Sequence, residues 1–232
     1  MKPLSKAIAS AALGLFTPGV FAQDEPVFHA IDMLHWEERI FSTTTEYRGV
    51  LLDGERVVRA RADDSASALY QRRNIDLSKT PYLQWRWRID RTLGTDINER
   101  SHDGDDFPAR VYVVRTGGLT FWRARVLNYV WSSSQPVGAR WTSPLAGTDT
   151  QMIAVDTGDD LAGQWQWHSR DIRADWLAAF GEELDRIDAV AIMTDSDNTG
   201  AALQAWYADI LFSAQPQAAA ALAGKPGTSG TD

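Results

Sequence analysis

Apolar and polar residues alternate along much of the chain, as they do in a β-strand with one buried and one exposed face. Between residues 83 and 90, leucine, two tryptophans and isoleucine alternate strictly with glutamine, two arginines and aspartate. Asp53 and Gly54 separate two similar runs, and this dipeptide accepts the positive φ angles of a tight hairpin turn. Strands are predicted for residues 47–52, 55–62, 83–89, 110–114, 123–132, 151–156, 164–167, 189–193 and 205–212. Many strands separated by turn residues predict an all-β fold, an antiparallel β-sandwich or jelly roll.

One segment has the period of an α-helix instead. Residues 171–180 place Ile172, Trp176 and Phe180 on one stripe, and Gly181 follows where a C-terminal cap belongs. Asp171 fits the N-terminal cap of the same helix. The sequence therefore predicts one short helix that packs over an edge or one end of the sandwich.

The two ends of the chain differ from the region between them. Residues 1–22 combine two lysines, an apolar run and a small residue at position 22, as in a secretory signal peptide. The apolar run is short for a bilayer span, so we expect cleavage before Gln23 rather than a membrane anchor. Residues 214–232 are rich in alanine, glycine and proline, which predicts a disordered tail. A single β-sandwich domain is expected over residues 23–213, in the periplasm or outside the cell.

The amino-acid composition limits the kinds of partner that the protein is expected to bind. The formal net charge is −8 at pH 7, and removal of the predicted signal peptide, with its two lysines and no acids, makes it −10. An acidic protein repels the phosphates of nucleic acids and anionic lipids, so neither is predicted as a partner. The chain has no cysteine, which excludes a disulfide framework and a thiol nucleophile. Its ten tryptophans suit either a sandwich core or a sugar-binding surface.

An acidic segment directly follows the predicted strand 189–193. Asp195, Asp197 and Thr199 present oxygen atoms at alternate positions before a glycine, as at the start of a calcium-binding loop. The twelfth position of this loop is a tryptophan rather than a glutamate, which excludes an EF-hand. Two interpretations remain: a simpler calcium site, and a turn in which these side chains bond to their own backbone.

A second acidic segment precedes the predicted strand 110–114. Asp105 and Asp106 lie four or five residues before Arg110. An aspartate paired with a buried arginine is a structural clamp. The alternatives are contact with a ligand or cation, and general acid–base catalysis. Neighbouring residues of an extended chain point to opposite faces, so we expect one of the two aspartates to enter a given site.

Three other residues are candidate ligand contacts. Arg86 lies on the polar face of the strand 83–89 and can line a groove, or can simply cover the sheet as a solvated charge. Trp131 lies in or near loop-rich sequence, where it can present a platform for a sugar ring, with a place in the core as the alternative. Arg170 stands beside the acid expected at the helix start. Histidines with metal-ligand spacing are absent from the sequence, as is the serine-hydrolase motif.

Five blocks of the sequence together resemble a family of exported bacterial proteins described only as a domain of unknown function. They include the motifs Gly-Asp-Asp-Phe-Pro-Ala-Arg-Val-Tyr and Thr-Asp-Ser-Asp-Asn-Thr, and they lie at residues 83–87, 104–113, 129–132, 170–171 and 194–199. The resemblance spans residues 28–212 and implies no activity. Residues 205–210 are more loosely similar to the last strand of galactose-binding-like jelly rolls. Those folds include many carbohydrate-binding modules, often with structural calcium, but this likeness implies a fold rather than a function.

The sequence favours an exported ligand-binding β-sandwich module for a glycan or another envelope ligand, stabilised by calcium at Asp195, Asp197 and Thr199. No catalytic residue is assigned. Ligand contacts are predicted at Arg86, Asp105, Asp106, Arg110, Trp131 and Arg170. A binding module requires aromatic and polar side chains that converge on one concave face.

Two alternatives stay open. A polysaccharide-acting enzyme requires two carboxylates roughly 5–10 Å apart across an open cleft, one with a raised pKa. A structural protein of the envelope would bury Arg110 and Arg170 against the acids, and that arrangement would count against the other two interpretations.

Overall fold

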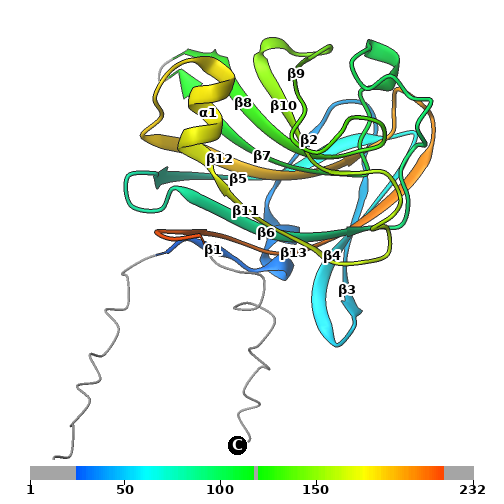
Figure 1. The fold of residues 1–232 in the computed structure, drawn as a ribbon. Coiled ribbons are helices and arrows are strands. Elements are labelled where there is room, and N and C mark those ends of the chain that lie inside the picture. The colour runs from blue at the N-terminus through cyan, green and yellow to red at the C-terminus, as the bar shows by residue number, and fades with distance from the viewer. Residues whose placement is uncertain (1–24, 118–119, 217–232) are drawn as a thin grey trace, which may run out of the picture.

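A computed structural model describes residues 25–117 and 120–216, and within them two β-sheets pack face to face (Figure 1). The predicted all-β sandwich is confirmed. The proposed signal peptide, residues 1–22, and most of the proposed tail, from residue 217, lie outside the described residues. No helix among the described residues is both long enough and apolar enough to cross a membrane.

The first sheet, called sheet A, has the strand order β11-β6-β13-β4-β3, and β1 also pairs with β13. Its strands are β1 (Val27–Phe28), β3 (Glu46–Leu52), β4 (Glu55–Asp63), β6 (Tyr82–Ile89), β11 (Gln166–Asp171) and β13 (Ala202–Ser213). The predicted hairpin joins β3 and β4, with φ angles of 54° at Asp53 and 83° at Gly54. A short 3-10 helix, Ala30–His35, packs against this hairpin.

The second sheet, called sheet B, has the order β2-β5-β12-β7-β8-β10-β9. Its strands are β2 (Glu37–Ile40), β5 (Ala66–Asp76), β7 (Ala109–Gly117), β8 (Thr120–Ser132), β9 (Arg140–Ser143), β10 (Gly147–Thr157) and β12 (Arg186–Asp195). Neighbouring strands run antiparallel except β8 and β10, which are parallel.

Aromatic side chains fill the space between the sheets. Trp85 and Trp87 of sheet A are fully buried, with ring centroids 5.4 Å apart. Trp85 also lies 5.2 Å from the ring of Tyr129 on sheet B. Burying a large aromatic side chain stabilises a fold by several kcal/mol, about 3–5 when it is lost to alanine. The tryptophans of the β6 pattern therefore hold the two layers together.

The helix α1 (Ile172–Phe180) is capped as its sequence predicts. The Asp171 carboxylate accepts a hydrogen bond from the Ala174 backbone N–H, and Gly181 adopts the left-handed conformation with φ 72°. Ile172 and Trp176 join the core between the sheets. The helix thus covers an edge of the sandwich (Figure 1).

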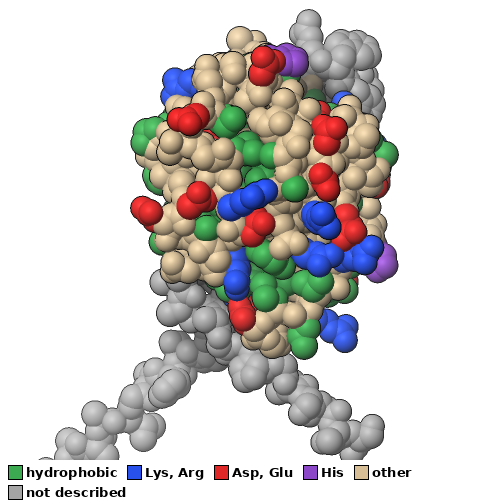
Figure 2. Space-filling model, turned by 90° about the vertical axis from the view of Figure 1, so that its right-hand side faces the viewer, with side chains coloured by type: hydrophobic (Ala, Val, Ile, Leu, Met, Phe, Trp, Pro, Cys, Tyr) green, Lys and Arg blue, Asp and Glu red, His purple; other side chains and the backbone are tan. Residues whose placement is uncertain are grey.

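Alternation along the strands also defines two outer faces. Trp85 and Trp87 point into the core, so Arg86 points outward from sheet A. Ala109 and Val111 point into the core, so Arg110 points outward from sheet B. Arg86 and Arg110 therefore lie on opposite sides of the molecule. On the side of the molecule shown in Figure 2, acidic and basic side chains are interleaved, with apolar side chains between them.

Candidate functional site

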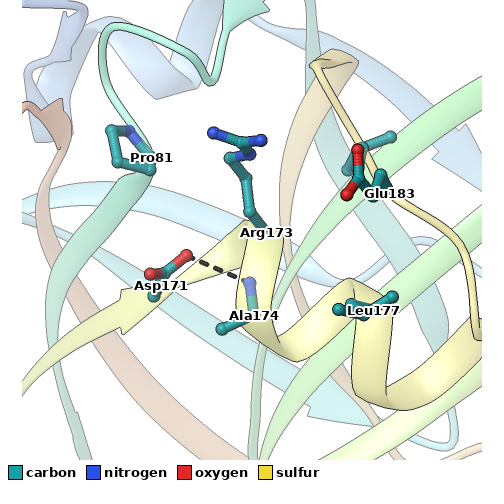
Figure 3. Close-up of a pocket in the computed structure, with 7 residues that line it drawn as sticks. Pro81, Asp171, Arg173, Ala174, Leu177 and Glu183 are labelled. Atoms are coloured by element: carbon teal, nitrogen blue, oxygen red, sulfur yellow. Dashed lines mark hydrogen bonds between the residues drawn. The ribbon is translucent and has the colours of Figure 1, made fainter.

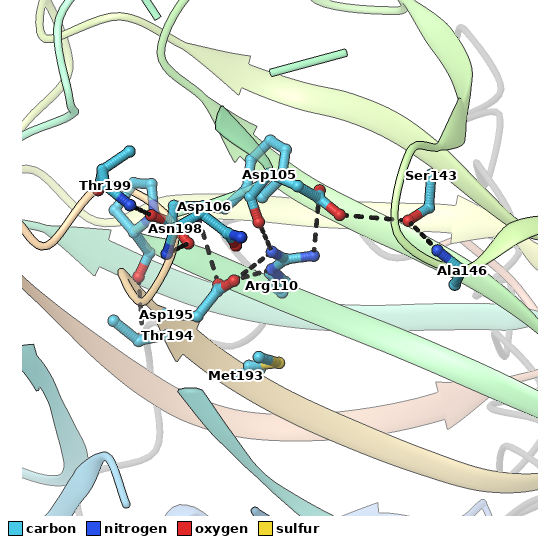
Figure 4. A network of polar contacts seen from close by, with 12 residues as sticks. Asp105, Asp106, Arg110, Ser143, Ala146, Met193, Thr194, Asp195, Asn198 and Thr199 are labelled. Carbon is cyan, nitrogen blue, oxygen red and sulfur yellow. Dashed lines mark hydrogen bonds and ion pairs between the residues drawn. The ribbon is translucent and has the colours of Figure 1, made fainter. Parts of the chain in front are cut away.

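The two acidic segments, 88 residues apart at Phe107 and Asp195, meet at one end of sheet B. Strands β7 and β12 are antiparallel neighbours with Arg110 opposite Met193. The start of β7 and the end of β12 therefore lie side by side (Figure 4). The term acid cluster is used below for Asp105, Asp106, Arg110, Asp195 and Asp197.

Arg110 forms the centre of the acid cluster. Its Nε donates to Asp195 Oδ1 at 2.7 Å, and its Nη2 donates to Asp195 Oδ2. Nη2 also donates to the backbone carbonyl of Asp105 at 2.5 Å. The side chains of Arg110 and Asp195 are 7% and 2% exposed. This bidentate, buried pair is the clamp that the sequence analysis named as one interpretation.

The two adjacent aspartates have separate partners. Asp106 is fully buried and accepts hydrogen bonds from the backbone N–H groups of Asn198 (3.2 Å) and Thr199 (2.7 Å). Asp105 accepts one from the hydroxyl of Ser143 on β9 at 3.2 Å. Both aspartates therefore tie loops to the sheet, and Asp106 fixes the turn that follows β12.

Three carboxylates converge beside this turn. Asp106, Asp195 and Asp197 each offer an oxygen, and these oxygens lie within 4.8 Å of one another. Three buried side-chain oxygens nearby in sequence have no hydrogen-bond partner among the described residues: Ser196 Oγ, Asn198 Oδ1 and Thr199 Oγ1. Oxygen donors without partners are what a hard cation requires.

The cluster contains more acid than base. Burial raises the pKa of Asp195 to about 7, against the opposing effect of Arg110. Burial also raises the pKa of Asp105 and of Asp197, and neighbouring carboxylates add to both effects. Burial lowers the pKa of Arg110, but the carboxylates of Asp195 and Asp105 outweigh it, so this arginine stays charged. Four carboxylates thus share one positive charge, which leaves room for a proton or a cation.

The predicted ligand contact Arg170 belongs to another network. Its Nε and Nη2 donate to the two carboxylate oxygens of Asp175 on α1, at 2.8 and 2.6 Å. Arg140 (2.8 Å) and the hydroxyl of Tyr129 (3.1 Å) bind the same carboxylate, which is 5% exposed. Arg170 therefore anchors the helix to the sandwich rather than joining the acid cluster.

The structure also separates Arg86 and Trp131 from the cluster. Arg86, on the outer face of sheet A, pairs with Glu55 and stacks over Trp165, 5.3 Å from the ring centroid. Trp131 is fully buried in the core, where its Nε1 donates to the carbonyl of Gly158 at 3.0 Å. Trp131 thus cannot present its ring to a sugar, because the strand β8 continues to Ser132 and turns this side chain inward.

Two hollows lie elsewhere. One of about 250 Å³ surrounds the start of α1 (Figure 3), where the Asp171 carboxylate is occupied by its capping bond. The other, of about 210 Å³, lies beside Trp36 and Arg73. Both are smaller than the roughly 300–1,000 Å³ of ordinary ligand pockets. Neither is lined by residues of the acid cluster.

Glu99, a fully buried acid in the loop before β7, was not predicted from the sequence. Its carboxylate accepts hydrogen bonds from the Ser132 hydroxyl and from the Ser133 backbone N–H at 2.5 Å. Burial raises its pKa, although these hydrogen bonds oppose the shift. No local pattern marks it, because a single glutamate in a polar loop is typical of an exposed residue.

Glu99→Gln is expected to change how stability depends on pH. A carboxyl whose folded pKa is raised contributes stability that is present below its ordinary value of 4.5 and is lost as pH rises through the folded pKa. The glutamine variant lacks this loss. Urea unfolding at several pH values between 4 and 7 should therefore show the variant gaining on the wild type as pH rises. A constant difference would contradict the raised pKa.

The sequence was compared with protein-family models and with curated proteins. A family model described as "Protein of unknown function (DUF3047)" matches residues 34–211, which confirms the family resemblance expected from the five sequence blocks. No curated protein matches the sequence.

Solved structures that are similar to the chain include three carbohydrate-related domains. The glycoside hydrolase domain of Endo-D from Streptococcus pneumoniae R6 is 10% identical (TM-score 0.41), over 78% of this chain and 22% of that one. The low-affinity xylan-binding module from Roseburia intestinalis is 13% identical (TM-score 0.34), over 82% and 94%. The xyloglucanase domain of NopAA from Sinorhizobium fredii is 9% identical (TM-score 0.32), over 81% and 97%. The chain thus spans about a fifth of the Endo-D chain.

Proposed function

We propose that this chain, which belongs to the DUF3047 family, is an exported ligand-binding β-sandwich module for a glycan or another envelope ligand, stabilised by calcium. The observation that carries the proposal is the acid cluster, in which four carboxylates share one arginine at one end of sheet B. Export rests on the signal-peptide pattern of residues 1–22.

Calcium fits the donors of the cluster. Ligand oxygens lie about 2.3–2.6 Å from a calcium ion, so two ligands of one ion are at most about 5 Å apart. The oxygens of Asp106, Asp195 and Asp197 meet this condition. Thr199, which the sequence analysis assigned to the metal, contributes a buried hydroxyl oxygen without a partner among the described residues. Asp106 is the addition from the structure, because it reaches the loop from a distant segment.

The same geometry argues against the enzyme. A glycosidase needs two carboxylates that line an open cleft. Asp105 and Asp195 are each 2% exposed, and Asp195 accepts hydrogen bonds from Nε and Nη2 of Arg110. These acids face protein groups instead of a substrate, so they support stability rather than catalysis.

A structural envelope protein is the second candidate. It is favoured by the two arginine clamps, since Arg110 is buried against Asp195 and Arg170 pairs with Asp175. These clamps also weaken the case that Asp105, Arg110 and Arg170 contact a ligand directly. Ligand binding elsewhere on the surface distinguishes the two candidates.

Calorimetric titration with calcium tests the proposal. We expect one ion per chain for protein recovered after export, with a mass that corresponds to a start at Gln23. Asp197→Asn removes one proposed calcium ligand and should weaken calcium binding. Asp103 lies outside the cluster with its side chain 96% exposed, so Asp103→Asn should leave calcium binding unchanged. Absence of a calcium signal in the wild type would contradict the proposed calcium site. A recovered protein that still contains residues 1–22 would contradict the proposed export.

A further inference from the structure

The tryptophans that keep part of their surface in solvent lie together on one side of the molecule. Of the tryptophans whose side chains the structure describes, Trp165, Trp167 and Trp206 are half-buried, and the others are buried. Trp206 on β13 lies between two residues that point into the core, so its ring points outward from sheet A. The register of β11 against β6 aligns Trp167 with the outward Arg86, and the Arg86 guanidinium lies over the ring of Trp165. All three therefore belong to the outer face of sheet A.

Arginine side chains orient two of these rings. Trp206 is aligned with Arg88 on β6 and with Arg59 on β4. The Arg88 guanidinium lies 5.4 Å from the centroid of the Trp206 ring, and the Arg86 guanidinium lies 5.3 Å from that of Trp165. A cation over an aromatic ring contributes about 0.5–1 kcal/mol at exposed sites, so each contact favours one orientation of its indole. Rings that are oriented in advance lose little entropy when a ligand stacks on them.

Accessible carboxylates pair with the same arginines. Arg88 Nη1 donates to Asp53 at 3.2 Å, and Arg86 Nη2 donates to Glu55. Both arginines lie on β6 and both acids in or beside the β3–β4 turn, so the two pairs reach across β13, the strand between β6 and β4. The side chains of Asp53 and Glu55 are 63% and 41% exposed. Their carboxylates are therefore open to solvent beside the rings and can accept hydrogen bonds from a ligand.

These ion pairs limit the chemistry of the ligand. Arg59, Arg86 and Arg88 each pair with a carboxylate, so the groups around the rings offer balanced charges rather than an excess of one sign. A charged ligand would have to break one of the pairs. A hydroxyl group both donates and accepts, so it can bond to a carboxylate and to a guanidinium without separating them. A sugar ring combines such hydroxyls with an apolar C–H face that stacks on an indole.

We infer that the outer face of sheet A is the binding site for an uncharged glycan chain, with Trp165 and Trp206 as stacking platforms and Asp53, Glu55 and Arg86 as hydrogen-bonding groups. This inference rests on the proposed function of a ligand-binding module. Arg86, a ligand contact predicted from the sequence, belongs to this site. The acid cluster lies on the other sheet, so calcium binding and glycan binding can be tested separately.

Affinity gel electrophoresis with soluble xylan, mixed-linkage β-glucan and galactomannan tests the site. We expect at least one of these neutral polysaccharides to retard the wild-type protein. Trp206→Ala should weaken that binding at least tenfold, as expected for truncation of a central aromatic contact, and Trp206→Tyr should retain part of it because the ring remains. Tyr112→Ala is the matched control and should leave retardation unchanged. Tyr112 is also a half-buried aromatic residue, but it lies on sheet B between two residues that point into the core and so faces the opposite side.

A measurement on the wild-type protein does not depend on whether a variant folds. Acrylamide quenches the fluorescence of accessible indoles, and the half-buried tryptophans that the structure describes lie on this face. The bound polysaccharide should therefore reduce quenching of the wild type, and it should do so less in Trp165→Phe/Trp206→Phe. A polysaccharide that binds but leaves quenching unchanged would place the ligand elsewhere and overturn the inference.

The outcomes separate this inference from the proposed function. Retardation that survives Trp206→Ala but is lost in Tyr112→Ala would overturn the site and leave the ligand-binding module in place. Absence of retardation by all three polysaccharides would overturn the inference, whether or not calcium binds. Retardation without a calcium signal would contradict only the proposed calcium site. Thermal unfolding of each variant shows whether a loss of binding is a loss of fold.

Discussion

Arg110→Met is expected to lower the free energy of unfolding by about 3–5 kcal/mol, because removing one partner of a buried ion pair leaves the other charge without compensation. Asp195 would lose both of its charged hydrogen bonds, and the Asp105 carbonyl would lose its donor. Methionine has a similar length and no charge, so the change isolates the electrostatic loss from a cavity. Urea unfolding of wild type and variant, at neutral pH with chelator present, measures the difference.

Two further variants make this prediction sharp. Arg115→Met alters the same strand, but the pair of Arg115 with Asp188 is partly exposed, so a loss of about 1 kcal/mol or less is expected. Adding Asp195→Leu to Arg110→Met removes both partners of the clamp and should restore part of the lost stability. If Arg110→Met costs no more than Arg115→Met, the buried clamp is not what holds the acid cluster together.

The sequence predicts strands best where one face of the strand is exposed to solvent. β6 alternates strictly because Trp85 and Trp87 face the core while Arg86 faces solvent. β5 was not predicted, and its first four residues explain why. Ala66, Ser67, Ala68 and Leu69 are all buried, since Tyr112 covers the outer side of the strand as well. A strand that is covered on both faces has no alternation to detect.

The candidate site was harder to predict because it depends on long-range pairing. Each acidic segment is visible in the sequence, and a clamp by Arg110 was one of the stated interpretations. Their meeting depends on the register of β7 against β12, which no local pattern encodes. The same limit applies to Arg86, whose outward direction follows from alternation but whose sheet does not.

Calcium is expected to raise the stability of the protein by about 4 kcal/mol when its concentration is about 1,000 times the dissociation constant. For a domain of this size, each kcal/mol shifts the melting temperature by about 2–4 °C, so the expected shift is about 8–16 °C. The physical reason is the charge balance of the acid cluster, in which a divalent cation offsets the repulsion among Asp106, Asp195 and Asp197. Thermal unfolding with excess calcium and with chelator measures the shift.

Variants of the cluster distinguish the effect of carboxylate repulsion on stability from the effect of calcium coordination. Asp106→Asn/Asp197→Asn should abolish the calcium shift. Asp197→Asn alone, which leaves the bonds of Asp106 to the turn intact, should raise the melting temperature in chelator, because one of the repelling charges is gone. Asp103→Asn should keep the full shift, since Asp103 is exposed and outside the cluster. If the double variant is less stable in chelator and the wild type shows no shift, the carboxylates serve only as acceptors for the turn at Asn198 and Thr199. The acid cluster would then be a clamp completed by Arg110 alone.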